Sequence, residues 1–207
     1  MLRPDQIGPT LGGMKVMTYL RTPVSVHAWD PRSVEVVDAL RQEIQADNAG
    51  QVVEHIGSTA VPGLAGKGIV DLMLPADPSA IPALVESLKA LGFQASRGFP
   101  VSRPLLLGTV ELDHDQDQDQ FVVHLHVIPA DSDEVAAQRG LAQALRDDPG
   151  LREEYADLKQ SIVDSGTTDP LPYSMGKIRW VLATLERLGL PSLPDPGAPP
   201  PSDSALE

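Results

Sequence analysis

Residues 69–74 form a short apolar run, IVDLML, in which a single carboxylate, Asp71, interrupts aliphatic side chains. A run of this kind is typical of a strand that is buried on both faces of a sheet. A carboxylate inside such a strand is costly unless it is paired with a cation or bound to a metal ion. The chain must therefore fold around an interior strand and give Asp71 a partner, either a salt bridge with Lys67 or Arg103 or a metal ion.

Strand-like and helix-like patterns alternate around this run. Alternating or continuous apolar segments predict further strands at residues 24–27, 51–57, 92–97, 103–112 and 120–128. Apolar residues at helical spacing, with proline near several starts, predict helices at residues 31–46, 78–91, 132–147, 149–165 and 173–188. Because the C-terminal half is helical, the sequence predicts an α/β (α+β) fold: a mixed β-sheet flanked by helices, with a helical C-terminal part.

The chain of 207 residues is long enough for one domain with appendages. Residues 1–13 are rich in glycine and proline, and residues 191–207 contain six prolines and no lysine or arginine. Such segments bury too little apolar surface to offset the entropy lost on ordering. We therefore expect a flexible N-terminal segment at 1–13, a single domain at 14–190 and a disordered Pro-rich tail at 191–207.

The charge balance excludes one class of partner. The formal net charge is −13, which disfavours a protein that coats nucleic acid by neutralising phosphates. Seven of these charges lie in residues 113–119 and 191–207, and we interpret the first segment as a solvated hairpin tip. The acidic balance therefore leaves room for a small phosphate ligand, and no general nucleic-acid binding is expected.

Two absences indicate the compartment. The chain has no cysteine, which excludes disulfides and Cys-ligated zinc and suits a reducing cytoplasm. Residues 1–13 lack the charged and apolar regions of a secretion signal, and no stretch approaches the roughly 18 apolar residues of a spanning helix. We therefore expect a cytoplasmic protein without membrane association.

A turn precedes the interior strand. In residues 54–73, EHIGSTAVPGLAGKGIVDLM, a predicted strand ends in glycine and serine before a tight turn or short helix. Gly57 lets the backbone approach a ligand closely, and Ser58 and Thr59 can donate hydrogen bonds to a phosphate together with backbone N–H groups. The alternative is structural: Ser58 simply caps a short helix.

Two histidines lie on one strand near the predicted site. His124 and His126 are two residues apart, so both project from the same face of the predicted strand at 120–128. They can act as metal ligands or as a phosphate-contacting pair, and His55, just before the Gly-Ser turn, can join them. The alternative is a structural polar network of these histidines with Asp71.

Further cations fit a phosphate pocket. Tyr173 and Lys177 share a helix face, so Lys177 either meets a phosphate or is a surface charge with Tyr173 packed beneath it. Arg103 can likewise face the cleft.

Several strings resemble the GrpB family. They are HIGSTAVPGL at residues 55–64, KGIVD at 67–71 and HLHV at 124–127, and the resemblance covers about residues 24–188. It implies a nucleotidyltransferase-superfamily fold similar to the core of DNA polymerase beta. In that superfamily a Gly-Ser turn holds the triphosphate of a nucleotide, and carboxylates on adjacent strands hold two Mg²⁺ ions. Gly57 and Ser58 match the Gly-Ser pair, and Asp71 matches the first carboxylate.

The chain departs from this pattern at the other carboxylates. Met73 stands at the second carboxylate position, and His124 or His126 takes the place of the third. Two hypotheses follow. One is a nucleotidyltransferase-like enzyme that acts on a nucleotide or phosphorylated metabolite with a divalent ion, Mg²⁺, Mn²⁺ or Zn²⁺; the other is a non-catalytic binding module that lost the second metal carboxylate.

The candidate site combines these residues. The expected phosphate- or nucleotide-binding residues are Gly57, Ser58, Thr59, Lys67, Arg103, Tyr173 and Lys177; the expected metal ligands are Asp71, His124, His126 and His55; and the expected catalytic residues are Asp71 and His126.

Overall fold

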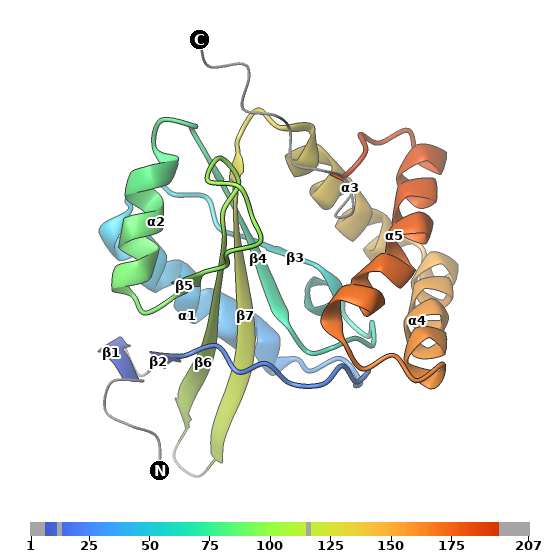
Figure 1. The fold of residues 1–207 in the computed structure, drawn as a ribbon, viewed down its shortest axis with the longest axis horizontal. Coiled ribbons are helices and arrows are strands. Elements are labelled where there is room, and N and C mark those ends of the chain that lie inside the picture. Colours follow the sequence, from blue (N-terminus) through green and yellow to red (C-terminus); the bar gives the residue numbers. More distant parts are fainter. Residues whose placement is uncertain (1–6, 12–13, 115–116, 195–207) are drawn as a thin grey trace.

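A mixed β-sheet forms the centre of the molecule in a computed structural model, which describes residues 7–11, 14–114 and 117–194 (Figure 1). The strands are β1 (Ile7–Leu11), β2 (Met14–Met17), β3 (Glu54–Ile56), β4 (Val70–Ala76), β5 (Gln94–Ala95), β6 (Leu105–His114) and β7 (Asp117–Pro129). Their order is β1-β2-β6-β7-β4-β3, and β5 pairs with β6. The β4 and β7 strands run parallel and the other pairs are antiparallel, so the predicted mixed sheet is confirmed.

The helices cover both faces of this sheet. They are α1 (Arg32–Asp47), α2 (Ile81–Ala90), α3 (Asp133–Asp147), α4 (Pro149–Asp164) and α5 (Pro170–Arg187). Figure 1 shows α1 and α2 on one side of the sheet and α3, α4 and α5 on the other. All five begin and end within a few residues of the predicted ranges, because proline starts and apolar spacing define them locally.

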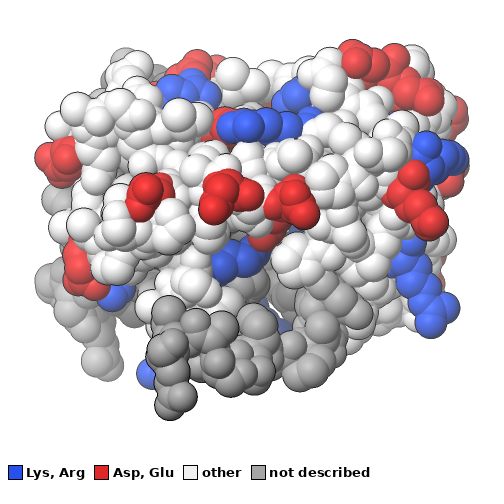
Figure 2. Space-filling view, turned by 90° about the horizontal axis from the view of Figure 1, so that it is seen from above, with Lys and Arg blue, Asp and Glu red and all other residues white. Residues whose placement is uncertain are grey.

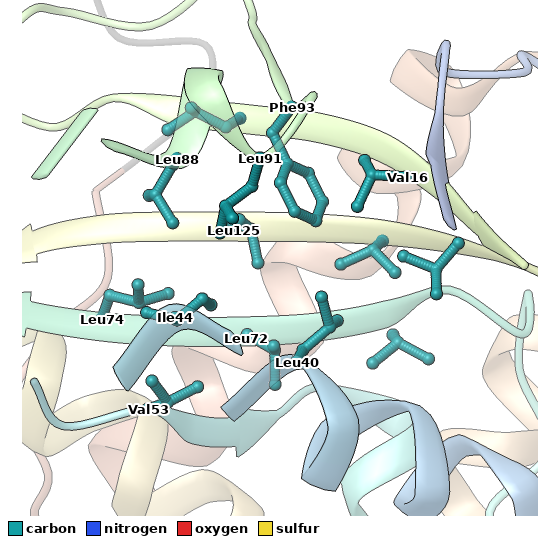
Figure 3. Packing of buried hydrophobic residues seen from close by; sticks show 14 of the residues in the cluster. Val16, Leu40, Ile44, Val53, Leu72, Leu74, Leu88, Leu91, Phe93 and Leu125 are labelled. Atoms are coloured by element: carbon teal, nitrogen blue, oxygen red, sulfur yellow. The ribbon is translucent and has the colours of Figure 1, made fainter. Parts of the chain in front are cut away.

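The face under α1 and α2 forms the main apolar core (Figure 3). Leu72 and Leu74 of β4 point into it together with Leu125 of β7. Leu40 and Ile44 of α1, four residues apart, pack against them. Burying side chains of this size contributes about 1.5–3 kcal/mol each, so this face anchors the strands that carry the candidate site.

The opposite face of β4 is different in character. Because side chains alternate along a strand, Asp71 and Met73 point away from the main core. Met73 is fully buried in a small apolar cluster with Ile56, Ile128 and Val135. Asp71 lies beside this cluster, on the side of the sheet that the C-terminal helices cover.

Three segments differ from the prediction. Residues 24–27 make only an isolated bridge, between His27 and Gly66, because no longer strand runs alongside them. Residues 7–11, expected within a flexible segment, form β1, and the unpredicted β2 joins β1 to the edge of β6. These short strands lack a strong apolar alternation. They depend on the backbone pairing of β1 with β2 and of β2 with β6, which sequence pattern does not show.

Two expectations reach beyond the described residues. Most of the predicted Pro-rich tail, residues 195–207, lies outside them, as do residues 115–116 within the acidic segment. No helix in the described ranges is long and apolar enough to cross a membrane.

Candidate phosphate and metal site

Strand register brings Asp71 together with two histidines. In the parallel pairing of β4 with β7, Asp71 lies opposite His124 and Met73 lies opposite His126. His124 Nδ1 and His126 Nε2 are each 3.3 Å from the same carboxylate oxygen, Asp71 Oδ1. These three side chains can hold a metal ion, because one ligand atom from each lies within 4.8 Å of the others.

The carboxylate of Asp71 is ionised. Burial raises its pKa, but hydrogen bonds and electrostatic attraction from His124 and His126 outweigh this and hold the pKa well below the usual aspartate range. The other ring nitrogens, His124 Nε2 and His126 Nδ1, are buried and have no hydrogen-bond partner among the described residues. The cluster therefore presents one negative charge and two imidazoles that a ligand can engage.

The turn after β3 lies directly against this carboxylate. Gly57 has a φ of 71°, in the left-handed region that favours glycine. A Cβ at Gly57 would lie 2.6 Å from Asp71 Oδ2, closer than real Cβ contacts. Only glycine therefore lets the backbone of the turn approach Asp71 in this way.

The hydroxyl of Ser58 does not cap the short 3₁₀ helix Ser58–Ala60, so the alternative of a simple helix cap is wrong. Ser58 Oγ instead accepts a hydrogen bond of 3.1 Å from Lys159 Nζ of α4, which also donates to Ala65 O. Thr59 is buried, and its hydroxyl donates to Ile69 O at 3.0 Å. Ser58 is thus held at the site by a lysine, whereas the hydroxyl of Thr59 braces the loop.

Lys159 is a site residue that the sequence reasoning missed. Its side chain is fully buried, and its ammonium lies 4.6 Å from the centre of the Tyr155 ring. It follows Leu151 and Tyr155 at intervals of four along the buried face of α4. A lysine placed on the apolar face of an amphipathic helix was the available signal, because such a position normally holds an aliphatic side chain.

Lys67 and Lys177 flank the same region. Their ammonium groups lie 5.3 and 4.5 Å from the centre of the Tyr173 ring. Tyr173 itself is buried, so it supports the two lysines with its ring. The packing of Tyr173 agrees with both interpretations of this helix face. Lys177 is partly buried, however, so it is not a simple surface charge.

The three lysines form a concentration of positive charge. Burial lowers the pKa of all three, and the charge of Lys177 adds to this effect at Lys67 and Lys159. The pKa of Lys159 falls to about 7. In the described part of the chain none of the three forms an ion pair with a carboxylate. The charge of Asp71 acts on Lys67 and Lys177 but offsets only part of the effect of burial. Crowded ammonium groups with no carboxylate in direct contact are the arrangement expected around an anionic ligand.

A cavity of about 490 Å³ adjoins the cluster. Ser58, Lys67 and His124 line one side of it, and residues of the segment from Tyr19 to Asp30 line the other. Backbone hydrogen bonds in both directions between His27 and Gly66 hold this segment close to the turn. The cavity therefore offers room for a small molecule beside the candidate metal ligands.

Two predicted site residues are not brought to the cluster. His55 is paired with Leu72, whose side chain faces the main core, and its Nε2 lies 2.9 Å from Thr59 Oγ1. Burial lowers the pKa of His55 to about 4, so the ring is neutral near pH 7. Arg103 makes a two-pronged ion pair with Glu134 of α3. This ion pair of Arg103 connects the loop before β6 to α3.

We expect the Arg103 pair to stabilise the fold without contributing to ligand binding. Glu134 is buried, so Arg103→Ala leaves an uncompensated buried charge and should lower the free energy of unfolding by about 3–5 kcal/mol. The double variant Arg103→Met with Glu134→Leu should recover most of this loss. Urea unfolding measures both effects. If the refolded double variant lost nucleotide binding, Arg103 would be a phosphate-binding residue after all.

The sequence of the chain is similar to those of known proteins. Residues 23–187 match the family model described as GrpB protein. UPF0157 protein PA4798 of Pseudomonas aeruginosa is 32% identical over 164 residues, which cover 77% of this chain and 64% of that protein. This chain thus spans slightly less than two thirds of the length of that relative.

Solved structures share the fold. The crystal structure of conserved protein GrpB from Enterococcus faecalis matches with a TM-score of 0.63 at 21% identity, over 79% of this chain and 96% of that chain. The GLD-2/RNP-8 complex matches with a TM-score of 0.52 at 15% identity, over 81% and 64% of the two chains. The mixed sheet flanked by helices is therefore a fold shared with these structures, and the chain belongs to the GrpB family.

Proposed function

We propose that this protein binds a nucleotide or a related phosphorylated metabolite at the Gly57 and Ser58 turn and transfers a nucleotidyl group to a small acceptor, with a divalent ion. One observation carries the proposal. The ammonium groups of Lys67, Lys159 and Lys177 converge beside the turn and lack carboxylate partners among the described residues. Ordinary protein cores exclude unpaired cations, so this cluster is best explained by an anionic ligand.

The phosphate chain would lie between the turn and helix α5. Backbone N–H groups at a turn like that of Gly57 and Ser58 bind phosphate oxygens, because they are oriented donors with a positive local potential. Lys67 and Lys177, which are only partly buried, can contact the ligand directly. Lys159 is fully buried and would act by holding Ser58 in place.

The reacting phosphate would lie near Asp71. A divalent ion held by Asp71, His124 and His126 would polarise the phosphate and stabilise charge that develops on its oxygens. The chain's own cations, Lys67 and Lys177, would stabilise the departing phosphates. The cavity beside His124 would admit the acceptor.

The experiment separates transfer from binding. The protein is incubated with each nucleoside triphosphate and Mg²⁺, Mn²⁺ or Zn²⁺, and binding and pyrophosphate release are measured for the wild type, Asp71→Ala and His126→Ala. Turnover that both variants lose supports the enzyme. Binding without turnover under every metal supports the non-catalytic module, and neither binding nor metal uptake leaves only a structural polar network.

The non-catalytic module is favoured by Met73. This residue occupies the second carboxylate position, and it is fully buried among apolar side chains. A thioether does not replace a carboxylate as a ligand for a hard cation. The fold would then bind its ligand without chemistry.

We also propose a small-molecule partner and a cytoplasmic location. On the face shown in Figure 2, acidic and basic side chains are scattered among uncharged ones, without a continuous basic surface among the described residues. This pattern, with the net charge of −13, supports a phosphorylated small molecule over a nucleic acid. The absence of cysteine supports a reducing compartment.

We expect phosphate affinity to decrease as pH rises through 7. Because the pKa of Lys159 is about 7, its ammonium loses its proton between pH 6 and pH 8. A ligand that requires the charged form should bind about tenfold more weakly at pH 8 than at pH 6. Calorimetric titration with pyrophosphate measures this change.

Lys159→Arg is the matched control for this titration. Its guanidinium stays charged over this range, and pyrophosphate's own titration affects both proteins equally. The tenfold decrease in affinity that is due to Lys159 should therefore be absent in the variant. Identical pH profiles for the wild type and the variant would show that Lys159 plays no part.

A further inference from the structure

The cluster on β4 and β7 differs from the metal centre of its fold family in a way that predicts which ion it takes. We infer that Asp71, His124 and His126 bind a single nitrogen-accepting transition ion in tetrahedral geometry, with Zn²⁺ as its representative, and not a pair of Mg²⁺ ions. This inference deepens the proposed function, on which its catalytic meaning rests, by naming the class of ion at the same site.

The residues do not fit two magnesium ions. Mg²⁺ prefers oxygen ligands in near-ideal octahedral geometry. Within the described residues the cluster supplies one carboxylate, Asp71, and two imidazoles. The position two residues after Asp71 is Met73, which is buried against apolar side chains.

Another carboxylate on the neighbouring strand, Glu54, is already engaged. Glu54 lies opposite Met73 in the pairing of β3 with β4. Its carboxylate accepts hydrogen bonds from Arg139, one of them 2.7 Å long. Glu54 therefore balances an arginine, and it is not part of the group that can hold an ion.

The distances fit a tetrahedral ion. With metal–ligand bonds of about 2.0–2.1 Å, a tetrahedron separates its ligand atoms by about 3.3–3.4 Å, whereas neighbouring ligands of an octahedron lie about 2.9 Å apart. His124 Nδ1 and His126 Nε2 are both 3.3 Å from Asp71 Oδ1, so both carboxylate–imidazole distances fit the tetrahedral value.

The donor set points to the same class. Imidazole suits zinc, cobalt and other late divalent ions, and magnesium disfavours it. Three protein ligands with a fourth position left for water or a substrate oxygen are typical of catalytic zinc sites. The side chains of His124 and His126 come from one strand and are held in place by the sheet, so the ligand set is preorganised.

Metal binding is measured on the full chain without any nucleotide. Chelator-treated protein is titrated calorimetrically with Zn²⁺, Co²⁺ and Mg²⁺, and the visible absorption of the Co²⁺ form is recorded. We expect one Zn²⁺ or Co²⁺ per chain, Mg²⁺ at least 100-fold weaker, and the intense absorption of tetrahedral Co²⁺. His124→Ala and His126→Ala should each weaken Zn²⁺ binding at least tenfold.

His55→Ala is the matched control, because it removes an imidazole from the same sheet whose strand position faces away from the cluster. It should bind Zn²⁺ like the wild type. His27→Ala should also bind normally, since this exposed histidine lines the cavity but is not part of the group that can hold an ion. Thermal melting checks that each variant is folded. If His126→Ala does not fold, His126→Gln takes its place.

The outcomes separate this inference from the proposed function. Mg²⁺ binding as tight as Zn²⁺, a Co²⁺ spectrum of octahedral form, or Zn²⁺ binding that survives in both folded histidine variants would overturn the inference. Nucleotidyl transfer that runs on Mg²⁺ alone and tolerates His126→Gln would overturn it and leave the function intact. If the protein bound one Zn²⁺ but transferred no nucleotidyl group with any metal, the inference would stand and the proposed enzyme activity would be wrong.

Discussion

Gly57→Ala is expected to abolish measurable nucleotide binding. The alanine Cβ would lie 2.6 Å from Asp71 Oδ2 and 3.1 Å from Asp71 Cβ, so the whole carboxylate side chain has to move. Such a shift separates Asp71 Oδ1 from both imidazoles. We expect affinity for each nucleoside triphosphate to fall at least 100-fold, which corresponds to about 2.7 kcal/mol, as measured by calorimetric titration.

Gly68→Ala provides the matched control. Gly68 lies in the same connection between β3 and β4, and its φ of 73° is close to the value of 71° at Gly57. A Cβ there meets no atom within 4 Å. Both variants therefore place an alanine at a positive φ, but only Gly57→Ala displaces Asp71. Wild-type affinity in Gly57→Ala, or an equal loss in the control, would show that the close approach is unimportant.

Asp71→Asn should have the largest effect on turnover. The amide keeps the size of the side chain but removes the negative charge that faces His124 and His126. Because the pKa of Asp71 is held well below the usual aspartate range, the wild-type group is fully charged at every pH at which an assay would run. Loss of that charge removes the anionic ligand of the proposed ion, and we expect pyrophosphate release to fall at least about 1,000-fold.

Asp77→Asn tests whether this loss is specific. Asp77 follows the last residue of β4 and is exposed, and in the described structure its carboxylate accepts hydrogen bonds only from Ser79. Its variant should turn over nucleotide at the wild-type rate. Full activity in Asp71→Asn would mean that the chemistry occurs elsewhere, whereas tight nucleotide binding with no turnover in the wild type would favour the binding module.

The strand that carries Asp71 was predictable because its signal is local. An apolar run with one carboxylate indicates an interior strand, and alternation along that strand separates Asp71 from Leu72 and Leu74. The same rule places His124 and His126 together on one face of β7. What the run could not reveal was the partner of Asp71, since Lys67, Arg103 and a metal ion all satisfied the same electrostatic requirement.

The sequence did not predict where the side chains of three candidate site residues lie. Arg103 is committed to Glu134, 31 positions away, and His55 is turned from the cluster by a shift of one position along β3. Lys159 reaches Ser58 across 101 positions of sequence. Residue type and spacing do not name the partners of Arg103 and Lys159, because these depend on how α3 and α4 pack on the sheet. The direction of His55 depends on the register of β3 against β4.

By itself the sequence determined the elements, the glycine turn and the faces of the strands, because dihedral preferences and side-chain alternation act over a few neighbouring residues. Tertiary structure decided which charges meet. The register of β4 against β7 puts both imidazoles on one oxygen of Asp71, and the packing of α4 and α5 brings three lysines to the turn. Electrostatic interactions are set by distance and burial, and both are properties of the folded chain.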